Sequence, residues 1–291
     1  MECQEKERVT TLQEAIEFFS LNANASKESE DARTLMYRGQ ADASFNLSPS
    51  IFRNNGLINE ARMIRELKRL APAEFGYNES ALDQLIKMQH YGLPTRLLDI
   101  TSNPLVALYF ACADDSCMDK DGEVITFYDY FTPHDSLDVK RYAELSTYEG
   151  STHQDLENFT LSDVPFEDSE KKVLIDNIKR YFGERYFFIS VPLNNERIRR
   201  QHGAFLLFGM DAEQQNNPFQ KEAFDIKNDI VESRDSDGIC RSIIIPAEAK
   251  KDMLQMLDAV GINRSFLFPE FEHQASYVKQ KFLEEGEEES L

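Results

Sequence analysis

The sequence predicts a single α+β domain, and three observations point to it. Stretches with the apolar spacing of amphipathic helices alternate with short, strongly apolar stretches that are typical of strands. Neither an internal repeat nor a Gly/Ser-rich linker divides the 291 residues. Apolar residues make up 41% of the chain, which is enough for a sizeable core. We therefore expect a mixed sheet flanked by helices, in one domain that spans residues 1–283.

Apolar residues that recur every three or four positions predict the helices. The first begins at Thr10 or Thr11, where a threonine followed by Glu14 suits an N-cap. Pro104 suits the first turn of another helix, and Gly261 suits the C-cap of a later one. The expected helices span residues 10–21, 58–70, 81–90, 104–113, 247–259 and 271–283, and a loop is expected at 22–31.

Short runs rich in β-branched and aromatic residues predict the strands. The first of them runs into Arg38-Gly39-Gln40, which we expect to form a turn at its end. A short basic turn is expected at residues 195–201. Residues 131–172 are rich in Asp, Glu, Ser and Thr and are expected to form an insertion, and the acidic residues 284–291 a solvated tail. The expected strands span residues 35–40, 124–128, 186–191, 204–208 and 240–246.

The charge balance limits the partners of the chain. It has 32 Lys and Arg against 52 Asp and Glu, a formal net charge of −20. That balance disfavours extended nucleic-acid binding and binding to anionic membranes, because such proteins neutralise phosphates with surplus Lys and Arg. The segments with motifs are a basic exception, which suits a compact anionic ligand. Their arginines are Arg38, Arg96, Arg197, Arg199 and Arg200.

Cysteine usage and hydropathy indicate the compartment. Cys3, Cys112, Cys117 and Cys240 form no CxxC pattern, so we expect reduced cysteines with a packing role. The charged beginning of the chain does not resemble a secretory signal, and no apolar run reaches the ~18 residues that cross a bilayer. The sequence therefore predicts a cytoplasmic protein without a membrane partner.

Arg38 lies beside Gly39, where a guanidinium group could serve a ligand. Arginine grips phosphate or carboxylate with two parallel hydrogen bonds, and glycine lets a backbone approach a ligand closely. The alternative is that Arg38 pairs with a carboxylate such as Asp99 and holds the turn. Arg96 and Asp99, three residues apart, have the same two interpretations: the wall of a polar pocket, or a pair that tethers a loop to the sheet.

Two similar segments, Gln89-His90-Tyr91-Gly92 and Gln201-His202-Gly203, place histidines beside glycines. Imidazole titrates near neutral pH, so either histidine could act as a general base, and the alternative is a hydrogen-bonded packing role. No HxxxH or HExxH pattern is present, and we expect no metal. A metal-dependent nuclease or hydrolase that uses His90, His202 and Asp99 is a third option for the function.

Several segments together resemble the FRG domain, a bacterial and phage-associated family named for a Phe/Tyr-Arg-Gly motif. They are Tyr37-Arg38-Gly39-Gln40, Leu47-Ser48-Pro49-Ser50 and the run QHYGLPTRLLDITSNPLVALYFA at residues 89–111. Residues 197–205 and 261–269 fit as well, so the resemblance covers residues 10–279. It implies membership of a family without a settled activity, in a bacterial cytoplasm.

The order of key residues is also similar to that in ADP-ribosyltransferases. There an Arg on one strand holds the phosphates of NAD, a Ser/Thr strand supports the nicotinamide pocket, and a Glu on a later strand stabilises the developing cation. Arg38 would take the first role and Thr101 or Ser102 the second. For the third, Gln201 stands near the expected place, with Glu196 upstream as a substitute. This resemblance implies an ADP-ribosyltransferase-like fold, with NAD as a substrate and no other cofactor.

We accordingly expect an Arg38-centred cleft that binds a nucleotide or another small, NAD-like phosphate ligand. In an active protein the cleft would transfer ADP-ribose to a protein target or hydrolyse NAD, as in a toxin or a defence effector. A non-catalytic protein-recognition module is the alternative. The candidate catalytic residues are Gln201, Glu196 and His90. The candidate ligand-binding residues are Arg38, Gly39, Gln40, Gln89, Arg96, Asp99, Thr101, Ser102 and His202.

Overall fold

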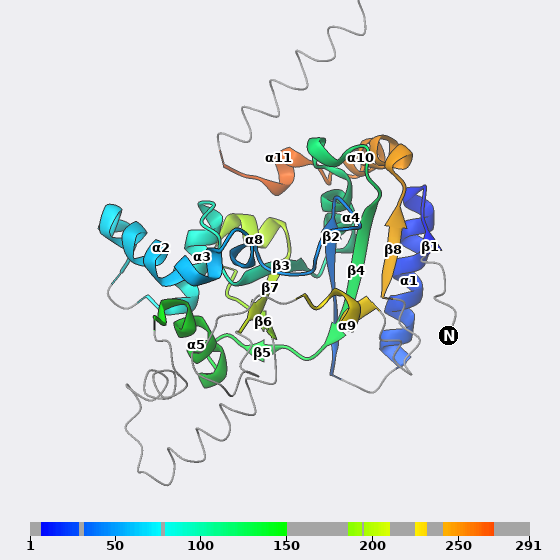
Figure 1. Ribbon diagram of the computed structural model, residues 1–291. Coiled ribbons are helices and arrows are strands. Elements are labelled where there is room, and N and C mark those ends of the chain that lie inside the picture. Colours follow the sequence, from blue (N-terminus) through cyan, green and yellow to red (C-terminus); the bar gives the residue numbers. More distant parts are fainter. Residues whose placement is uncertain are drawn as a thin grey trace, which may run out of the picture.

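A mixed β-sheet runs through the computed structural model of the chain (Figure 1). The structure describes residues 7–28, 32–76, 79–149, 186–193, 195–209, 225–231 and 241–270. Within these residues eight strands lie in the order β1-β8-β4-β2-β3-β7-β6-β5. The outer pairs β1/β8 and β5/β6 are parallel, and the other pairs are antiparallel. The strands are β1 (Glu7–Arg8), β2 (Thr34–Gln40), β3 (Leu97–Thr101), β4 (Gly122–Asp129), β5 (Thr132–Pro133), β6 (Tyr186–Ser190), β7 (Gly203–Phe208) and β8 (Ser242–Ile245).

Helices accompany the sheet, so the expected α+β class is confirmed. The described helices are α1 (Leu12–Glu28), α2 (Gly56–Leu70), α3 (Ala81–His90), α4 (Pro104–Cys112), α5 (Leu137–Glu144), α8 (Glu196–Arg200), α9 (Lys227–Val231), α10 (Lys250–Ala259) and α11 (Arg264–Leu267). Short 3-10 turns cover Ser50–Phe52, Pro72–Glu74, Asp115–Cys117, Leu145–Thr147 and Ala247–Ala249.

The sheet opens between β2 and β3. Strand β2 pairs with β4 along its whole length, but it meets β3 only where Tyr37 faces Thr101. Beyond that pair the two strands diverge, and Figure 1 shows β3 running across the direction of β2 and β4. The segment Arg38-Gly39-Gln40, expected to form a turn, lies inside β2 along this opening. The opening positions the candidate site described below.

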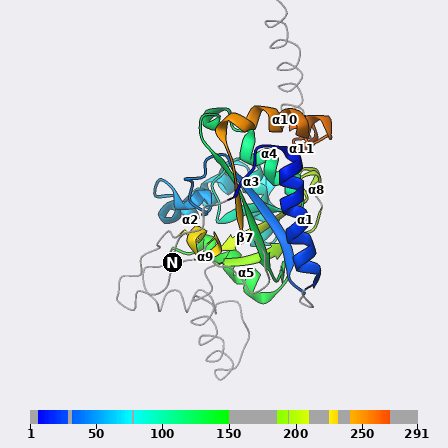
Figure 2. The ribbon, with the colours of Figure 1, turned by 90° about the vertical axis from the view of Figure 1, so that its right-hand side faces the viewer.

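Three clusters of buried apolar side chains fill the two faces of the sheet. One lies between α1, α4, α10 and the half of the sheet around β4 and β8. A second joins α3 and α5 to β6 and β7. The third covers the opposite face, where Leu47 and Ile226 pack against β3, β4 and β7. Figure 2 shows α1 and α8 on one side of the strands and α9 on the other.

The first helix begins as expected but continues further. Glu14 accepts hydrogen bonds from the backbone N–H groups of Thr10 and Thr11, and the Thr11 hydroxyl accepts one from Glu14 N–H, so a capping box starts the helix. The prediction of a loop at residues 22–31 is wrong for residues 22–28, because α1 extends to Glu28. Asn22 is 2% exposed, and tertiary packing overrides the weak helix propensity of this polar segment.

Three other expectations differ from the structure. The basic turn expected at residues 195–201 is the short helix α8, capped by the Asn195 side chain. Strand β3 was not predicted from the apolar pattern, because an exposed Asp99 interrupts it, although the resemblance to ADP-ribosyltransferases implied a strand at Thr101 or Ser102. Residues 137–148, expected within an insertion, pack into the core: Val139 and Leu145 are almost completely buried.

Some expectations fall outside the described residues. These are the helix at 271–283, the tail at 284–291, the part of the insertion from residue 150, and the cysteines Cys3 and Cys240. Cys112 and Cys117 are buried free thiols, and burial raises the pKa of Cys112 to about 12. Among the described helices, not one combines the length and the apolar character needed to cross a membrane.

Candidate functional site

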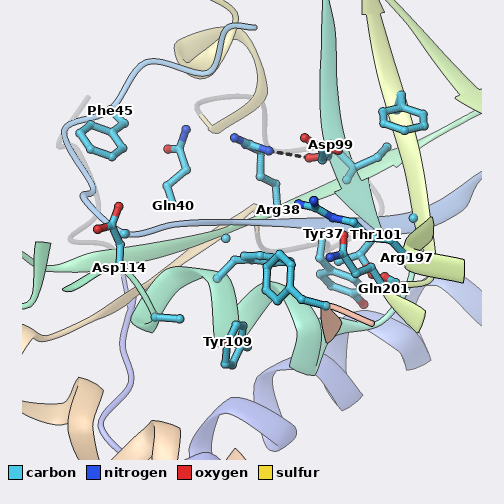
Figure 3. Close-up of a pocket in the computed structure, with 18 of the residues that line it drawn as sticks. Tyr37, Arg38, Gln40, Phe45, Asp99, Thr101, Tyr109, Asp114, Arg197 and Gln201 are labelled. Atoms are coloured by element: carbon cyan, nitrogen blue, oxygen red, sulfur yellow. Dashed lines mark hydrogen bonds between the residues drawn. The ribbon is translucent and has the colours of Figure 1, made fainter. Parts of the chain in front are cut away.

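A cavity of about 740 Å³ lies where β2 and β3 separate (Figure 3). Helix α4 contributes Tyr109 and Phe110 to its wall, and Phe45 and Phe268 add further aromatic rings. Burial raises the pKa of Tyr109 to about 12, so this hydroxyl stays neutral at physiological pH. The charged side chains of the wall are Arg38, Arg53, Arg197, Arg264, Asp99, Asp114 and Asp115.

Arg38 crosses the opening in the sheet (Figure 3). Its Nη1 donates a hydrogen bond of 2.6 Å to the backbone carbonyl of Asp99 on β3, where β2 offers no backbone partner. Its Nε is buried and has no hydrogen-bond partner among the described residues. Burial lowers the pKa of Arg38, and Arg53 lowers it further, whereas Asp99 raises it. The cavity wall thus holds a half-buried cation whose hydrogen-bond donors are only partly used among the described residues.

Asp99 is held from the opposite side by α3. Its Oδ2 accepts a 2.8 Å hydrogen bond from Gln89 Nε2. Gln89 Oε1 accepts in turn from the hydroxyl of Thr95, which is 1% exposed. Gln89 therefore does not line the cavity itself but orients a carboxylate that does.

Thr101 and Gln201 line the cavity on the β3/β7 side, but both also hold the fold together. The Thr101 hydroxyl donates to the Gln201 backbone carbonyl at 2.6 Å and accepts from Asn103 N–H. Gln201 Nε2 donates to the carbonyl of Leu267 in α11. Ser102, by contrast, is exposed and does not line the cavity.

Gly39 and Gln40 line the cavity while serving the packing around it. A Cβ at Gly39 would clash with the backbone of α4, 2.6 Å from the nitrogen of Ala111. Gly39 therefore allows a close approach of β2 to α4. Gln40 is 4% exposed, and its amide bonds the Asn46 carbonyl and the Lys227 ammonium.

Arg96 is part of the core, and its partner is not Asp99 as one interpretation expected. Its guanidinium forms a two-pronged ion pair with Glu60 of α2 and donates to the Phe208 carbonyl. Arg96 and Glu60 are 0% and 1% exposed. The pair lies away from the cavity wall.

The other three candidates also lie off the cavity wall. His90 Nε2 bonds Glu270 at 2.7 Å. Glu196 is exposed and pairs with Arg200 and Arg199 on its own helix. His202 is exposed in the turn before β7, with a positive φ of 48°. Glu196 therefore does not place a carboxylate in the cavity in the structure.

Several residues of the site had no usable signal in the sequence. Arg53 follows a 3-10 turn and Arg264 begins α11, and neither belongs to a pattern of spacing. Lys250 is completely buried and its ammonium donates to the carbonyls of Ala41 and Cys117, at 2.6 and 2.8 Å. It thereby fastens two loops at the rim of the cavity.

The described residues contain no group of three His, Cys, Asp or Glu side chains that could hold a metal ion.

The fold and the cavity define an α+β protein whose charged site lies at an opening in a mixed sheet. Residues 33–120 match the family model of the FRG domain, so the chain contains an FRG domain. The matched segment holds Arg38, Asp99, Thr101 and Tyr109, one side of the cavity. Neither the curated proteins nor the solved structures include a match to this chain.

Proposed function

We propose that the cavity binds a small phosphate-bearing ligand of the nucleotide type, with NAD the leading candidate. The observation that carries this proposal is Arg38, a half-buried arginine of the cavity wall whose buried Nε has no hydrogen-bond partner among the described residues. A neighbouring positive charge on Arg53 adds to its electrostatic cost. An anion at this point would supply an acceptor for the unused donors and would offset the repulsion between the two arginines, and phosphate fits both needs.

The surroundings of Arg38 support a nucleotide over a bare phosphate. A volume of 740 Å³ is in the range of pockets for cofactors and other small molecules. The rings of Tyr109, Phe110 and Phe45 on its wall suit the apolar faces of a base or a nicotinamide. The strands that carry Arg38 and Thr101 are neighbours, and Gln201 precedes β7, which pairs with β3. The residues that the resemblance to ADP-ribosyltransferases singles out therefore lie on or beside adjacent strands.

Titration calorimetry with ADP-ribose, ADP and adenosine tests the proposal. ADP-ribose and ADP should bind, and adenosine should bind at least about tenfold more weakly because it lacks phosphate. Arg53→Ala should weaken ADP-ribose binding by about tenfold or more, since hydrogen bonds to charged groups contribute about 1.5–3 kcal/mol. Arg53 is exposed, so this variant should keep its melting temperature.

Arg62→Ala is the matched control, because Arg62 is exposed on α2 and does not line the cavity. It removes the same charge and should leave binding unchanged. If the folded wild-type protein binds neither ADP-ribose nor ADP, the proposal is wrong. If Arg53→Ala and Arg62→Ala weaken binding equally, the ligand binds elsewhere.

A catalytic form of this function would transfer ADP-ribose to a cytoplasmic protein or hydrolyse NAD, as a toxin or defence effector does. Incubation of a cell lysate with labelled NAD and the wild-type protein would reveal a modified target. Loss of the label with Arg53→Ala but not with Arg62→Ala would connect the modification to the cavity.

A non-catalytic recognition module is the second candidate, and the bond from Arg38 to the Asp99 carbonyl favours it. In that case the arginine chiefly closes the opening in the sheet. Arg38→Ala would then lower the melting temperature strongly, and no nucleotide would bind to the wild type. Binding of ADP-ribose by the wild type decides against this candidate.

A further inference from the structure

Asp99 is a carboxylate of the cavity wall that is linked to the core by a chain of two hydrogen bonds. Gln89 Nε2 donates to its Oδ2 at 2.8 Å, and the Thr95 hydroxyl fixes the amide of Gln89 by donating to Oε1. An amide whose oxygen is occupied in this way must present its N–H to the carboxylate. Thr95 is 1% exposed, so the chain of hydrogen bonds is anchored in the core.

Asp114, another carboxylate of the cavity wall, is already used within the fold. Asp114 Oδ1 accepts from both the backbone N–H and the hydroxyl of Ser116, and thus caps the 3-10 turn after α4. Asp99, by contrast, acts on Arg38: its charge raises the pKa of that residue, and its carbonyl accepts the Arg38 hydrogen bond. A ligand whose phosphate meets Arg38 therefore lies in the same cavity as Asp99.

We propose that Asp99 is the catalytic carboxylate of a ribosyl-transfer reaction, and that Gln89 and Thr95 position it. This inference rests on the proposed binding of an NAD-type ligand at Arg38. The sequence suggested Glu196 as the carboxylate that stabilises the developing cation, but Glu196 pairs with Arg200 outside the cavity. We assign this role to Asp99 on β3 instead.

The reaction at this site is cleavage of the bond between ribose C1′ and the nicotinamide nitrogen. The electron pair of that bond leaves with nicotinamide, and positive charge develops on the ribose. The Asp99 carboxylate stabilises that charge. Water or a protein nucleophile then bonds to C1′ and loses its proton to Asp99, which releases it to solvent. With water as acceptor the products are ADP-ribose, nicotinamide and one proton.

Asp99→Asn tests the assignment through two measurements, the rate of nicotinamide release and the affinity for ADP-ribose. Release of nicotinamide from NAD should fall by about 100-fold or more, the usual effect of losing one group that stabilises transition-state charge. The affinity for ADP-ribose should stay equal or rise, because a negative charge near the phosphates is removed. The asparagine oxygen can still accept from Gln89, so the fold should be retained.

Asp119→Asn is the charge-matched control, because Asp119 is exposed and does not line the cavity. Its release of nicotinamide should equal that of the wild type. Retention of release by Asp99→Asn within about threefold of this control would overturn the assignment.

Gln89→Leu tests the positioning role. It removes the hydrogen bond to Asp99 and should lower kcat by about tenfold while KM is unchanged, because the carboxylate remains but is less well oriented. The variant also removes the acceptor of the buried Thr95 hydroxyl and should melt at a lower temperature, so kcat is measured where the variant is fully folded. A purely structural role would leave the kcat of the folded variant unchanged. An unchanged kcat would show that Asp99 needs no positioning by Gln89.

The remaining outcomes separate this inference from the proposed function. If the wild type binds ADP-ribose but releases no nicotinamide from NAD, the role of Asp99 is wrong while the binding proposal stands. If the wild type does not bind ADP-ribose, the proposed function itself fails. Equal loss of ADP-ribose binding and of nicotinamide release in Asp99→Asn would make Asp99 a binding residue and overturn its catalytic assignment.

Discussion

Arg38 and Arg96 belong to equally suggestive segments of the sequence, yet their surroundings differ completely. Arg38 keeps a buried Nε without a partner among the described residues, and it lines the cavity. Arg96 meets Glu60, 36 positions earlier in the chain, and both its carboxylate contacts lie in the core. The sequence predicts that an arginine in such a segment has an anionic partner. It does not reveal whether that partner is the protein or a ligand, because the pairing of residues so far apart depends on tertiary packing.

The buried pair of Arg96 and Glu60 leads to a stability prediction. Glu60→Gln removes the negative charge and leaves the Arg96 cation in the core, so it should lower the free energy of unfolding by about 3–5 kcal/mol. Replacing both residues by apolar ones of similar size, as in Glu60→Leu with Arg96→Met, should recover much of the loss. Urea unfolding measures both values. A loss below about 1 kcal/mol for Glu60→Gln would contradict the buried pair.

At the scale of single elements, the longer helices and strands could be predicted, whereas β3 and several short elements could not. The helix expected at 81–90 has these bounds in α3, and its N-cap Ser80 accepts from Asp83 N–H, because local spacing and capping decide where a helix begins. Strand β3 depends instead on β7, with which it pairs from Leu97 to Thr101. No local pattern in residues 97–101 predicts that pairing, and Asp99 interrupts the apolar pattern.

The contact between β2 and α4 explains why the Tyr-Arg-Gly segment needs its glycine. Gly39→Ala would force a Cβ against the backbone of Ala107 and Ala111, which cannot move without displacing the helix. We expect it to lower the free energy of unfolding by at least about 2 kcal/mol, in the range known for overpacked sites. Thermal or urea unfolding of the purified variant measures the change.

Gly76→Ala is the matched control, since among the described residues a Cβ at Gly76 would meet only the side chain of Glu79, at 3.9 Å. The control should change the free energy of unfolding by less than about 1 kcal/mol. Similar losses in the two variants would mean that the tight approach of α4 to β2 is not what makes Gly39 necessary.

For the whole molecule, the pattern of apolar residues predicted the class of fold but could not predict the cavity. Its wall joins Arg38 and Asp99, within the FRG match, to Arg197 and Arg264 far beyond it. Those distant segments meet because the strand order brings β3 and β7 together. The expectation of a basic cleft was also too simple, since three aspartates accompany the four arginines in the cavity wall. Balanced charge of this kind comes from the fold and not from any single segment.

The two halves of the sheet meet at one strand pairing, Tyr37 with Thr101, and the cavity lies across that seam. A ligand bound there contacts both halves, through Arg38 on β2 and Asp99 on β3. The two halves are β1, β8, β4 and β2 on one side of the seam and β3, β7, β6 and β5 on the other. If they unfold as one unit, ADP-ribose at 100 times its Kd should stabilise both halves by about 2.7 kcal/mol, because the ligand binds only the folded state. Hydrogen exchange by mass spectrometry should then show the slowest amides of β4 and β8, and those of β6 and β7, slowed by the same factor of about 100. Slowing confined to one of these halves would contradict the prediction and mean that the chain unfolds as two units, with the ligand held by only one of them.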